Sequence, residues 1–219
     1  MAARPVARPW QVEAVIAAPP PRQPSLLSRL VWRAMRWLYR RKGYQVGNRP
    51  PNLAKFIIVG APHTSNWDFI FFAGAVQEVG IKPSFIGKHS LFKWPMRRFM
   101  FDMGGMPINR KAPQGYVKSV IQMIERAETI ALVIAPEGTR SSDGKWKTGF
   151  YHIAMGAGVP IVPAWLDAAS GKAGFGEAIM PTGDLRADLL RLAAFYRQHM
   201  PDCPRFAVLE AQALAIPRD

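Results

Sequence analysis

The chain has 219 residues, of which 49% are hydrophobic and 20% charged, which suits one domain with a buried core and excludes global disorder. The 29 Lys and Arg against 15 Asp and Glu give a formal net charge of +14, which favours an anionic partner such as a nucleic acid, a membrane surface or a phosphorylated substrate. Because Cys203 is the only cysteine, an intramolecular disulfide and a multi-cysteine metal site are excluded.

Most of the excess positive charge lies in residues 1–50, in which Glu13 is the only acid. Residues 1–24 are rich in Ala, Arg and Pro, and the three consecutive prolines at 19–21 predict a flexible or extended arm instead of a helix. The short apolar stretch 12–18 contains Glu13 and ends at a proline, so we expect no signal peptide, and a transit peptide stays an alternative. No apolar run approaches the roughly 20 residues of a membrane-spanning helix, so none is expected.

Residues 25–43 predict a basic amphipathic helix that precedes the domain. Its apolar positions recur at spacings of three and four, at Leu26, Leu27, Leu30, Val31, Ala34, Trp37 and Leu38. Arginines occupy another side, at Arg29, Arg33, Arg36 and Arg40. Such a helix can lie among the headgroups of anionic lipid, and its apolar face can equally pack on the domain, so both interpretations stay open.

Residues 44–205 alternate short apolar runs with helical periods, which is typical of an α/β domain with a central mixed, mostly parallel sheet flanked by helices. Strands are predicted at 55–60, 82–87, 105–108, 130–135, 159–165 and 175–180. Helices are predicted at 66–79, 90–101, 113–127, 147–157 and 184–199. We treat residues 206–219 as a C-terminal tail whose pattern fits a strand, a short helix or a loose end.

A candidate catalytic pair follows the first of these strands. The apolar run 56–59 ends at Gly60, and His63 and Asp68 come next, five residues apart. In one continuous helix that spacing would put the two side chains on different faces, so they can meet only if His63 stays in the loop and Asp68 enters the next helix. A loop histidine held by a carboxylate can act as a general base. A His and an Asp at this spacing are also common as structural pairs.

Four segments together resemble the PlsC-like glycerolipid acyltransferases, the family of 1-acyl-glycerol-3-phosphate and other lysophospholipid acyltransferases. The first family motif, His-x4-Asp, is matched by His63 to Asp68, and the second by the run 104–110 that ends at Arg110. The third reads Pro136-Glu137-Gly138-Thr139-Arg140, and the fourth resembles residues 159–163. The sequence departs from the family pattern at Pro107, Asn109 and Ala135, which leaves the acceptor's identity open.

The resemblance implies a glycerol-3-phosphate acyltransferase-like fold and a role for each matched residue. His63 would deprotonate an acceptor hydroxyl that attacks an acyl thioester, and Asp68 would orient the imidazole. Arg110 and Arg140 would bind the acceptor phosphate, since a guanidinium grips phosphate in bidentate fashion. The other acceptor-site residues would be Glu137, Gly138, Thr139 and Lys147.

The implied enzyme needs no cofactor, and acyl-CoA or acyl carrier protein is its co-substrate. Neither a nucleotide-binding glycine motif nor a metal-ligand spacing of histidines occurs, and nucleic acid is not expected as a partner. The expected acceptor is a lysophospholipid, most simply 1-acyl-glycerol-3-phosphate, in phospholipid biosynthesis. We expect a bacterial, cytoplasmic protein bound peripherally to the anionic inner face of the cell membrane. The alternatives are an acyltransferase for another alcohol, such as a lyso-ornithine lipid, and a non-catalytic basic protein that binds membranes or nucleic acid.

Overall fold

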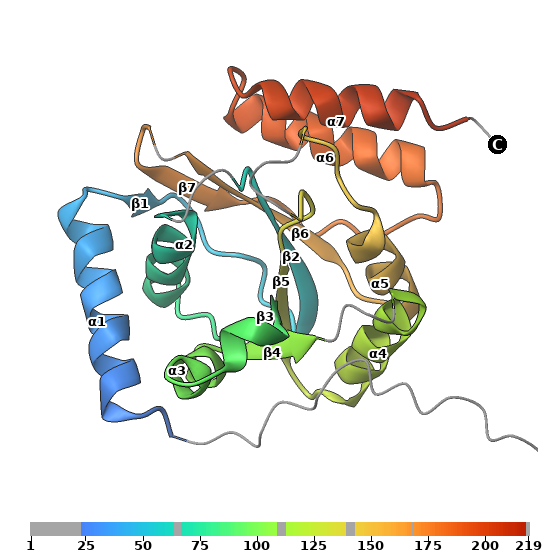
Figure 1. The fold of residues 1–219 in the computed structure, drawn as a ribbon. Coiled ribbons are helices and arrows are strands. Elements are labelled where there is room, and N and C mark those ends of the chain that lie inside the picture. Colours follow the sequence, from blue (N-terminus) through green and yellow to red (C-terminus); the bar gives the residue numbers. More distant parts are fainter. Residues whose placement is uncertain (1–22, 64–66, 109–112, 139–142, 168, 218–219) are drawn as a thin grey trace, which may run out of the picture.

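A seven-stranded sheet organises the molecule (Figure 1). The computed structural model describes residues 23–63, 67–108, 113–138, 143–167 and 169–217. The strands are β1 (Gln45–Val46), β2 (Lys55–Ala61), β3 (Pro83–Lys88), β4 (Gly105–Ile108), β5 (Ile130–Ile134), β6 (Ile161–Asp167) and β7 (Lys172–Phe175). Their order is β1-β7-β6-β2-β5-β3-β4, and every neighbouring pair is parallel except β6 and β7. The predicted mixed, mostly parallel α/β sheet is thereby confirmed.

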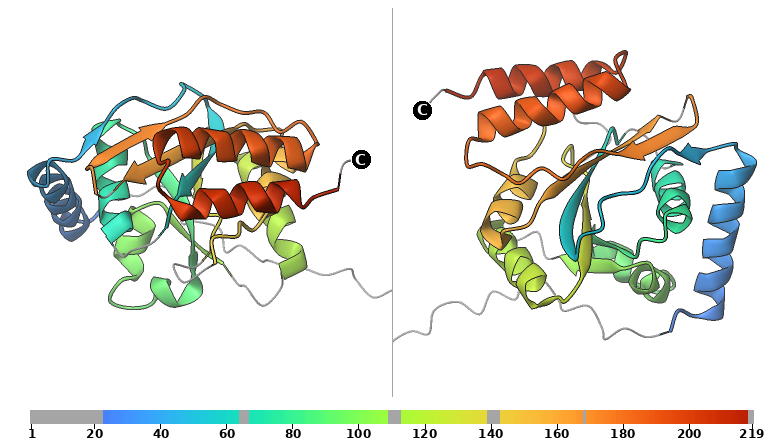
Figure 2. Two further views of the ribbon diagram at one scale, coloured as in Figure 1. Left: turned by 90° about the horizontal axis from the view of Figure 1, so that it is seen from above. Right: turned by 180° about the vertical axis from the view of Figure 1, so that it is seen from behind.

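Helices cover both faces of the sheet (Figures 1 and 2). They are α1 (Leu26–Arg41), α2 (Trp67–Glu78), the 3-10 helix η1 (His89–Phe92), α3 (Arg97–Asp102), α4 (Pro113–Arg126), α5 (Gly149–Ala157), α6 (Leu185–His199) and α7 (Pro204–Leu214). The predicted amphipathic helix is α1, and the side chain of Ser25 caps its N-terminus.

The alternation of side chains along β2 explains why both faces are buried. Ile57 and Val59 join a large apolar cluster with α4, α5, α6 and α7, whereas Phe56 and Ile58 face a smaller cluster on the opposite side. Beyond that smaller cluster, α1 packs on α2 through Tyr39. A parallel strand buried on both faces reads as a continuous apolar run, which is how the sequence around residues 56–59 appears.

Two predicted elements differ from the structure, and one strand of the structure was not predicted. The helix predicted at 90–101 is divided into η1 and α3, because Pro95 lies between them and disfavours a helical residue before it. In place of the strand predicted at 175–180, the structure has β7 at Lys172–Phe175, which shares only Phe175 with the prediction. Beyond β7, Ile179 makes an isolated bridge to Ile161. The short strand β1 was not predicted.

The segment 206–219 is not a tail through most of its length. Residues 204–214 form α7, which begins with Pro204 in the first turn and buries Phe206, Leu209 and Ala213. These side chains join the large core cluster, and α7 lies beside α6 (Figure 2). The domain therefore extends beyond residue 205. The predicted arm, residues 1–24, falls almost entirely outside the described residues.

Candidate active site

His63 and Asp68 come together at the carboxyl end of β2. His63 follows the strand in a loop and Asp68 lies in the first turn of α2, as the spacing required. The His63 Nδ1 atom is 3.5 Å from Asp68 Oδ2. The histidine side chain is 27% exposed and the aspartate side chain 11%. If Nδ1 carries its proton toward the Asp68 carboxylate, Nε2 is free to accept a proton. His63 is also the more exposed residue of the pair.

Glu137 lies at the carboxyl end of the neighbouring strand, β5, and is buried, with 1% of its surface exposed. Its Oε2 accepts a charge-assisted hydrogen bond from the Arg205 guanidinium, in α7. Burial raises the pKa of Glu137, and Arg205, the backbone N–H of His63 and the His63 imidazole oppose that rise. The Glu137 carboxylate thus interacts with both the backbone N–H and the imidazole of His63, so the first and third motifs lie in one site.

The loop after Glu137 folds back toward the start of α5. The Lys147 N–H donates to the Pro136 carbonyl at 2.9 Å, and Gly138 has a left-handed backbone with φ of +72°. A Cβ at Gly138 would lie 3.2 Å from Lys147 Nζ, so the lysine head group sits beside this turn. Lys147 therefore lies next to the third motif, with an exposed side chain, and its role in the acceptor site stays a prediction.

Arg110, Thr139 and Arg140 fall outside the described residues, so the predicted phosphate-binding pair of arginines stays a prediction. Among the described residues, no cluster of three or more His, Cys, Asp or Glu side chains could hold a metal ion. No helix within the described ranges is long and apolar enough to span a membrane.

Sequence reasoning missed Arg205. Its partner Glu137 is 68 positions away, and the segment around Arg205 was assigned to the domain boundary and a tail. The signal that could have found it is the apolar spacing of Phe206, Leu209 and Ala213, which has a helical period and places Arg205 on a helix that packs on the core.

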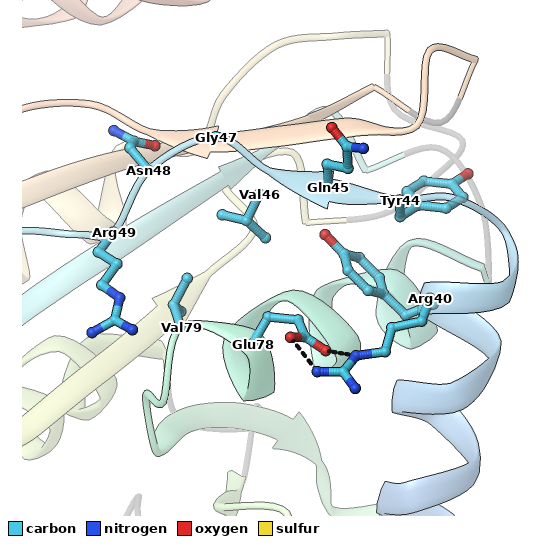
Figure 3. Close-up of a pocket in the computed structure, with 10 residues that line it drawn as sticks. Arg40, Tyr44, Gln45, Val46, Gly47, Asn48, Arg49, Glu78 and Val79 are labelled. Carbon is cyan, nitrogen blue, oxygen red and sulfur yellow. Dashed lines mark hydrogen bonds and ion pairs between the residues drawn. The ribbon is translucent and has the colours of Figure 1, made fainter.

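Two hollows in the described part of the chain lie apart from the His63–Asp68 pair and Glu137. A cavity of about 550 Å³ lies between α1, β1 and the end of α2, and the ion pair of Arg40 with Glu78 lines it (Figure 3). A groove of about 2200 Å³ lies along the amino ends of β2, β3 and β5. Neither is lined by His63, Asp68 or Glu137.

Taken together, the described geometry combines a partly exposed imidazole, a carboxylate 3.5 Å from its Nδ1 atom, and a second, buried carboxylate held by an arginine. Such an arrangement can remove a proton from a hydroxyl group that docks at His63 Nε2. The carboxyl ends of parallel strands, where all three groups lie, are the usual edge for ligand sites in open α/β sheets.

Comparisons with known proteins agree with this chemistry. A family model described as Acyltransferase matches residues 38–167. The 1-acyl-sn-glycerol-3-phosphate acyltransferase of Escherichia coli (strain K12) is 30% identical over 119 residues, covering 51% of this chain and 47% of its own. The corresponding chloroplastic BAT2 protein of Brassica napus is 37% identical over 110 residues (48% and 30%), and that of Haemophilus influenzae is 27% identical over 150 residues (63% and 61%). The chain thus covers between 30% and 61% of the length of these three relatives. No solved structure gives a significant match.

Proposed function

The chain belongs to the acyltransferase family, and on that premise we propose that it transfers a fatty acyl group from an acyl thioester to the hydroxyl of a lysophospholipid-type acceptor. The first acceptor to test is 1-acyl-glycerol-3-phosphate, because the named relatives act on it. The observation that carries the proposal is the 3.5 Å approach of His63 Nδ1 to Asp68 Oδ2 at the carboxyl end of β2.

In the proposed reaction, His63 Nε2 accepts the proton of the acceptor hydroxyl as its oxygen attacks the thioester carbonyl carbon. Asp68 stabilises the imidazolium that forms. The C–S bond then breaks, the new ester bond remains, and the proton passes from His63 to the departing thiolate. A positioned base of this kind contributes about 10²- to 10⁴-fold to the rate. The thioester is supplied by acyl-CoA or acyl carrier protein, and no cofactor takes part.

Acceptor recognition is proposed to rest on the second and third motifs. Arg110 and Arg140 would grip the phosphate, and Glu137, Gly138, Thr139 and Lys147 would shape the pocket around the glycerol. Support comes from Lys147, whose ammonium lies beside Gly138 and adds positive charge next to the third motif. Replacement of Arg110 or Arg140 by Met should therefore raise KM for the acceptor much more than KM for the thioester.

The test is thiol release from a long-chain acyl-CoA on mixed liposomes, with and without lysophosphatidic acid, for the wild type and for His63→Ala. His152→Ala is the matched control, since His152 lies on the exposed side of α5 and takes no part in the site. We expect acceptor-dependent release that His63→Ala abolishes and His152→Ala retains.

Release that depends on a different lysolipid, such as a lyso-ornithine lipid, would keep acyl transfer and change the acceptor. Absence of release with every acceptor, from both acyl-CoA and acyl carrier protein, would contradict the proposed activity. A non-catalytic basic protein would then be favoured, and binding of DNA that weakens steeply with salt would identify it.

We also propose that the protein acts at the anionic inner face of a bacterial cell membrane, bound peripherally through α1 and the η1–α3 segment. Large apolar side chains are exposed on both, including Leu26 at 77%, Leu30 at 61% and Trp94 at 90%. Arg98 of α3 reaches the Gln23 carbonyl beside the start of α1, and Trp32 and Trp94 line one groove, so the two segments form one surface. Exposed arginines and Lys93 on the same segments would attract anionic lipid.

Flotation with vesicles of phosphatidylcholine, with and without phosphatidylglycerol, tests this location. Leu26→Ser combined with Leu30→Ser should reduce binding to the anionic vesicles. Met180→Ser removes an exposed apolar side chain outside these two segments and should leave binding unchanged. Equal binding by all three proteins would contradict the proposed membrane surface.

A further inference from the structure

Helix α7 lies beyond the residues that match the family model, yet it holds the loop of the third motif. Gln212 makes two hydrogen bonds of 2.8 Å with the backbone of Trp146, one with its N–H and one with its carbonyl. Gly144, with φ of +88°, packs so closely on α7 that a Cβ there would lie 3.4 Å from the Arg205 Cα. The loop from the third motif to α5 is thus attached to α7 at several points.

Among these contacts of α7, the one made by Arg205 extends to the candidate active site, where it binds the Glu137 carboxylate. Its side chain is 20% exposed, whereas the Glu137 carboxylate that it binds has no exposure at all. A carboxylate at that depth needs a cation partner to remain charged, and Arg205 is the arginine that forms an ion pair with it. The same carboxylate interacts with the backbone and the imidazole of His63.

We propose that Arg205 is a positioning residue for acyl transfer: from a helix outside the family match, it fixes the charged Glu137 carboxylate beside His63. The proposal rests on the acyl-transfer activity proposed above. Arg205 touches neither the acceptor nor the thioester in this scheme. It acts through Glu137, which keeps the third-motif loop in register with the imidazole of the first motif.

Several other groups surround the Glu137 carboxylate and belong to the same electrostatic environment. They are His63 after β2, Tyr196 on α6 and Cys203 just before α7, and the Lys147 head group lies beside the next residue, Gly138. Arg205 and Lys147 are the only permanent cations of this set, and Lys147 is exposed, so the charge state of Glu137 depends chiefly on Arg205.

The test compares Arg205→Met and Arg205→Lys with Arg197→Met. The control removes the Arg197–Glu210 ion pair, which joins α6 to α7 on the exposed side of the same helix pair, so it reproduces any loosening of α7. For acyl transfer, Arg205→Met should lower kcat/KM on the order of 10²-fold, as misplaced reacting groups do. Arg205→Lys should recover part of the loss because it restores the cation, and Arg197→Met should match the wild type.

A second readout does not need substrate. The NMR signals of the His63 imidazole are compared at one pH between each protein and the variants Glu137→Gln and Glu137→Gln/Arg205→Met. Without Arg205 the buried Glu137 carboxylate loses its ion-pair partner and is no longer held beside His63, so the signals of the His63 ring should shift from those of the wild type. The double variant carries no uncompensated buried charge, so it provides the measurement if Arg205→Met does not fold. Its His63 signals should differ little from those of Glu137→Gln, because Arg205 acts through Glu137.

His63 ring signals that are the same in Arg205→Met as in Arg197→Met would overturn the proposal, and so would equal losses of activity in these two variants. Absence of acyl transfer by the wild type would instead contradict the proposed function, and the NMR comparison would still decide whether Arg205 acts on His63 through Glu137.

Discussion

The hydroxyl of Tyr196, in α6, donates a hydrogen bond of 2.6 Å to the backbone carbonyl of Val59, in β2. Tyr196 is fully buried and its ring stacks on Phe206 of α7 at a centroid distance of 4.7 Å. Burial raises the pKa of Tyr196, so the hydroxyl stays protonated and able to donate. Because Val59 lies four residues before His63, the C-terminal helix pair is joined directly to the strand that delivers the histidine.

Tyr196→Phe should lower the free energy of unfolding by about 1 to 2 kcal/mol, since a buried carbonyl loses a partner. Tyr39→Phe is the matched control, because the Tyr39 hydroxyl is also buried but has no hydrogen-bond partner among the described residues, so its removal should cost little. Urea unfolding of both variants measures the difference. Equal free energies for the two would mean that the Tyr196 hydrogen bond does not stabilise the fold.

Asp68→Asn should lower kcat for acyl transfer by about 10²- to 10⁴-fold, with little change in KM for the thioester. An amide can present its N–H₂ to His63 Nδ1, which would favour the tautomer that carries its proton on Nε2 and cannot act as the base. Asp202→Asn, at an exposed position before α7, is the control for the loss of a surface carboxylate. Retention of kcat in Asp68→Asn would show that the carboxylate is not needed to orient His63.

The features that depend on residues close together in the sequence could be predicted from the sequence. The apolar run 56–59 marks a strand buried on both faces, and the chain leaves it at His63, so the His63–Asp68 pair and its place at the strand end could be expected from the sequence. The division of the helix predicted at 90–101 could also have been expected, since Pro95 stands in its middle.

Contacts between distant segments could not be predicted in this way. Arg205 meets Glu137 only because α7 folds back over the large core, and a guanidinium in the sequence says nothing about which carboxylate it will meet. The hydrogen bonds of Gln212 with Trp146 span 66 positions and depend on the same packing. The helical spacing in α7 was present in the sequence, but the partners of that helix were decided by tertiary structure.

The ion pairs that join α1 to α2 predict a pH-dependent stability. Hydrogen bonds from Arg40 and Arg36 lower the pKa of Glu78 to about 2 from an ordinary value of 4.5 (Figure 3 shows the Arg40 pair). A carboxyl group with a lowered pKa in the folded protein stabilises it when ionised. That stabilisation is fully present above the unfolded-state pKa and is lost as the pH falls through the folded-state value.

Glu78→Gln should therefore lower the free energy of unfolding by about 1 kcal/mol at pH 7, a modest figure because the Arg36 and Arg40 side chains are 43% and 60% exposed. The difference from the wild type should shrink as the pH falls from about 4.5 toward 2. Glu128→Gln removes an exposed carboxylate that forms no ion pair within the described residues, and it should show neither effect. Thermal unfolding measured across this pH range would contradict the prediction if the Glu78 difference were independent of pH.

The contact between α1 and α2 depends on a glycine. A Cβ at Gly74 would lie 2.5 Å from both Cβ and Cγ of Tyr39, atoms close to the backbone that cannot swing away. Gly74→Ala should therefore push α1 off α2 and lower the free energy of unfolding by about 1 to 3 kcal/mol, despite the higher helix propensity of alanine. Gly149→Ala, in α5, is the control, since no atom would lie within 4 Å of its Cβ and alanine should leave stability unchanged or increase it. Denaturant unfolding compares the two, and a Gly74→Ala protein as stable as Gly149→Ala would show that α1 tolerates displacement from α2 without loss of stability.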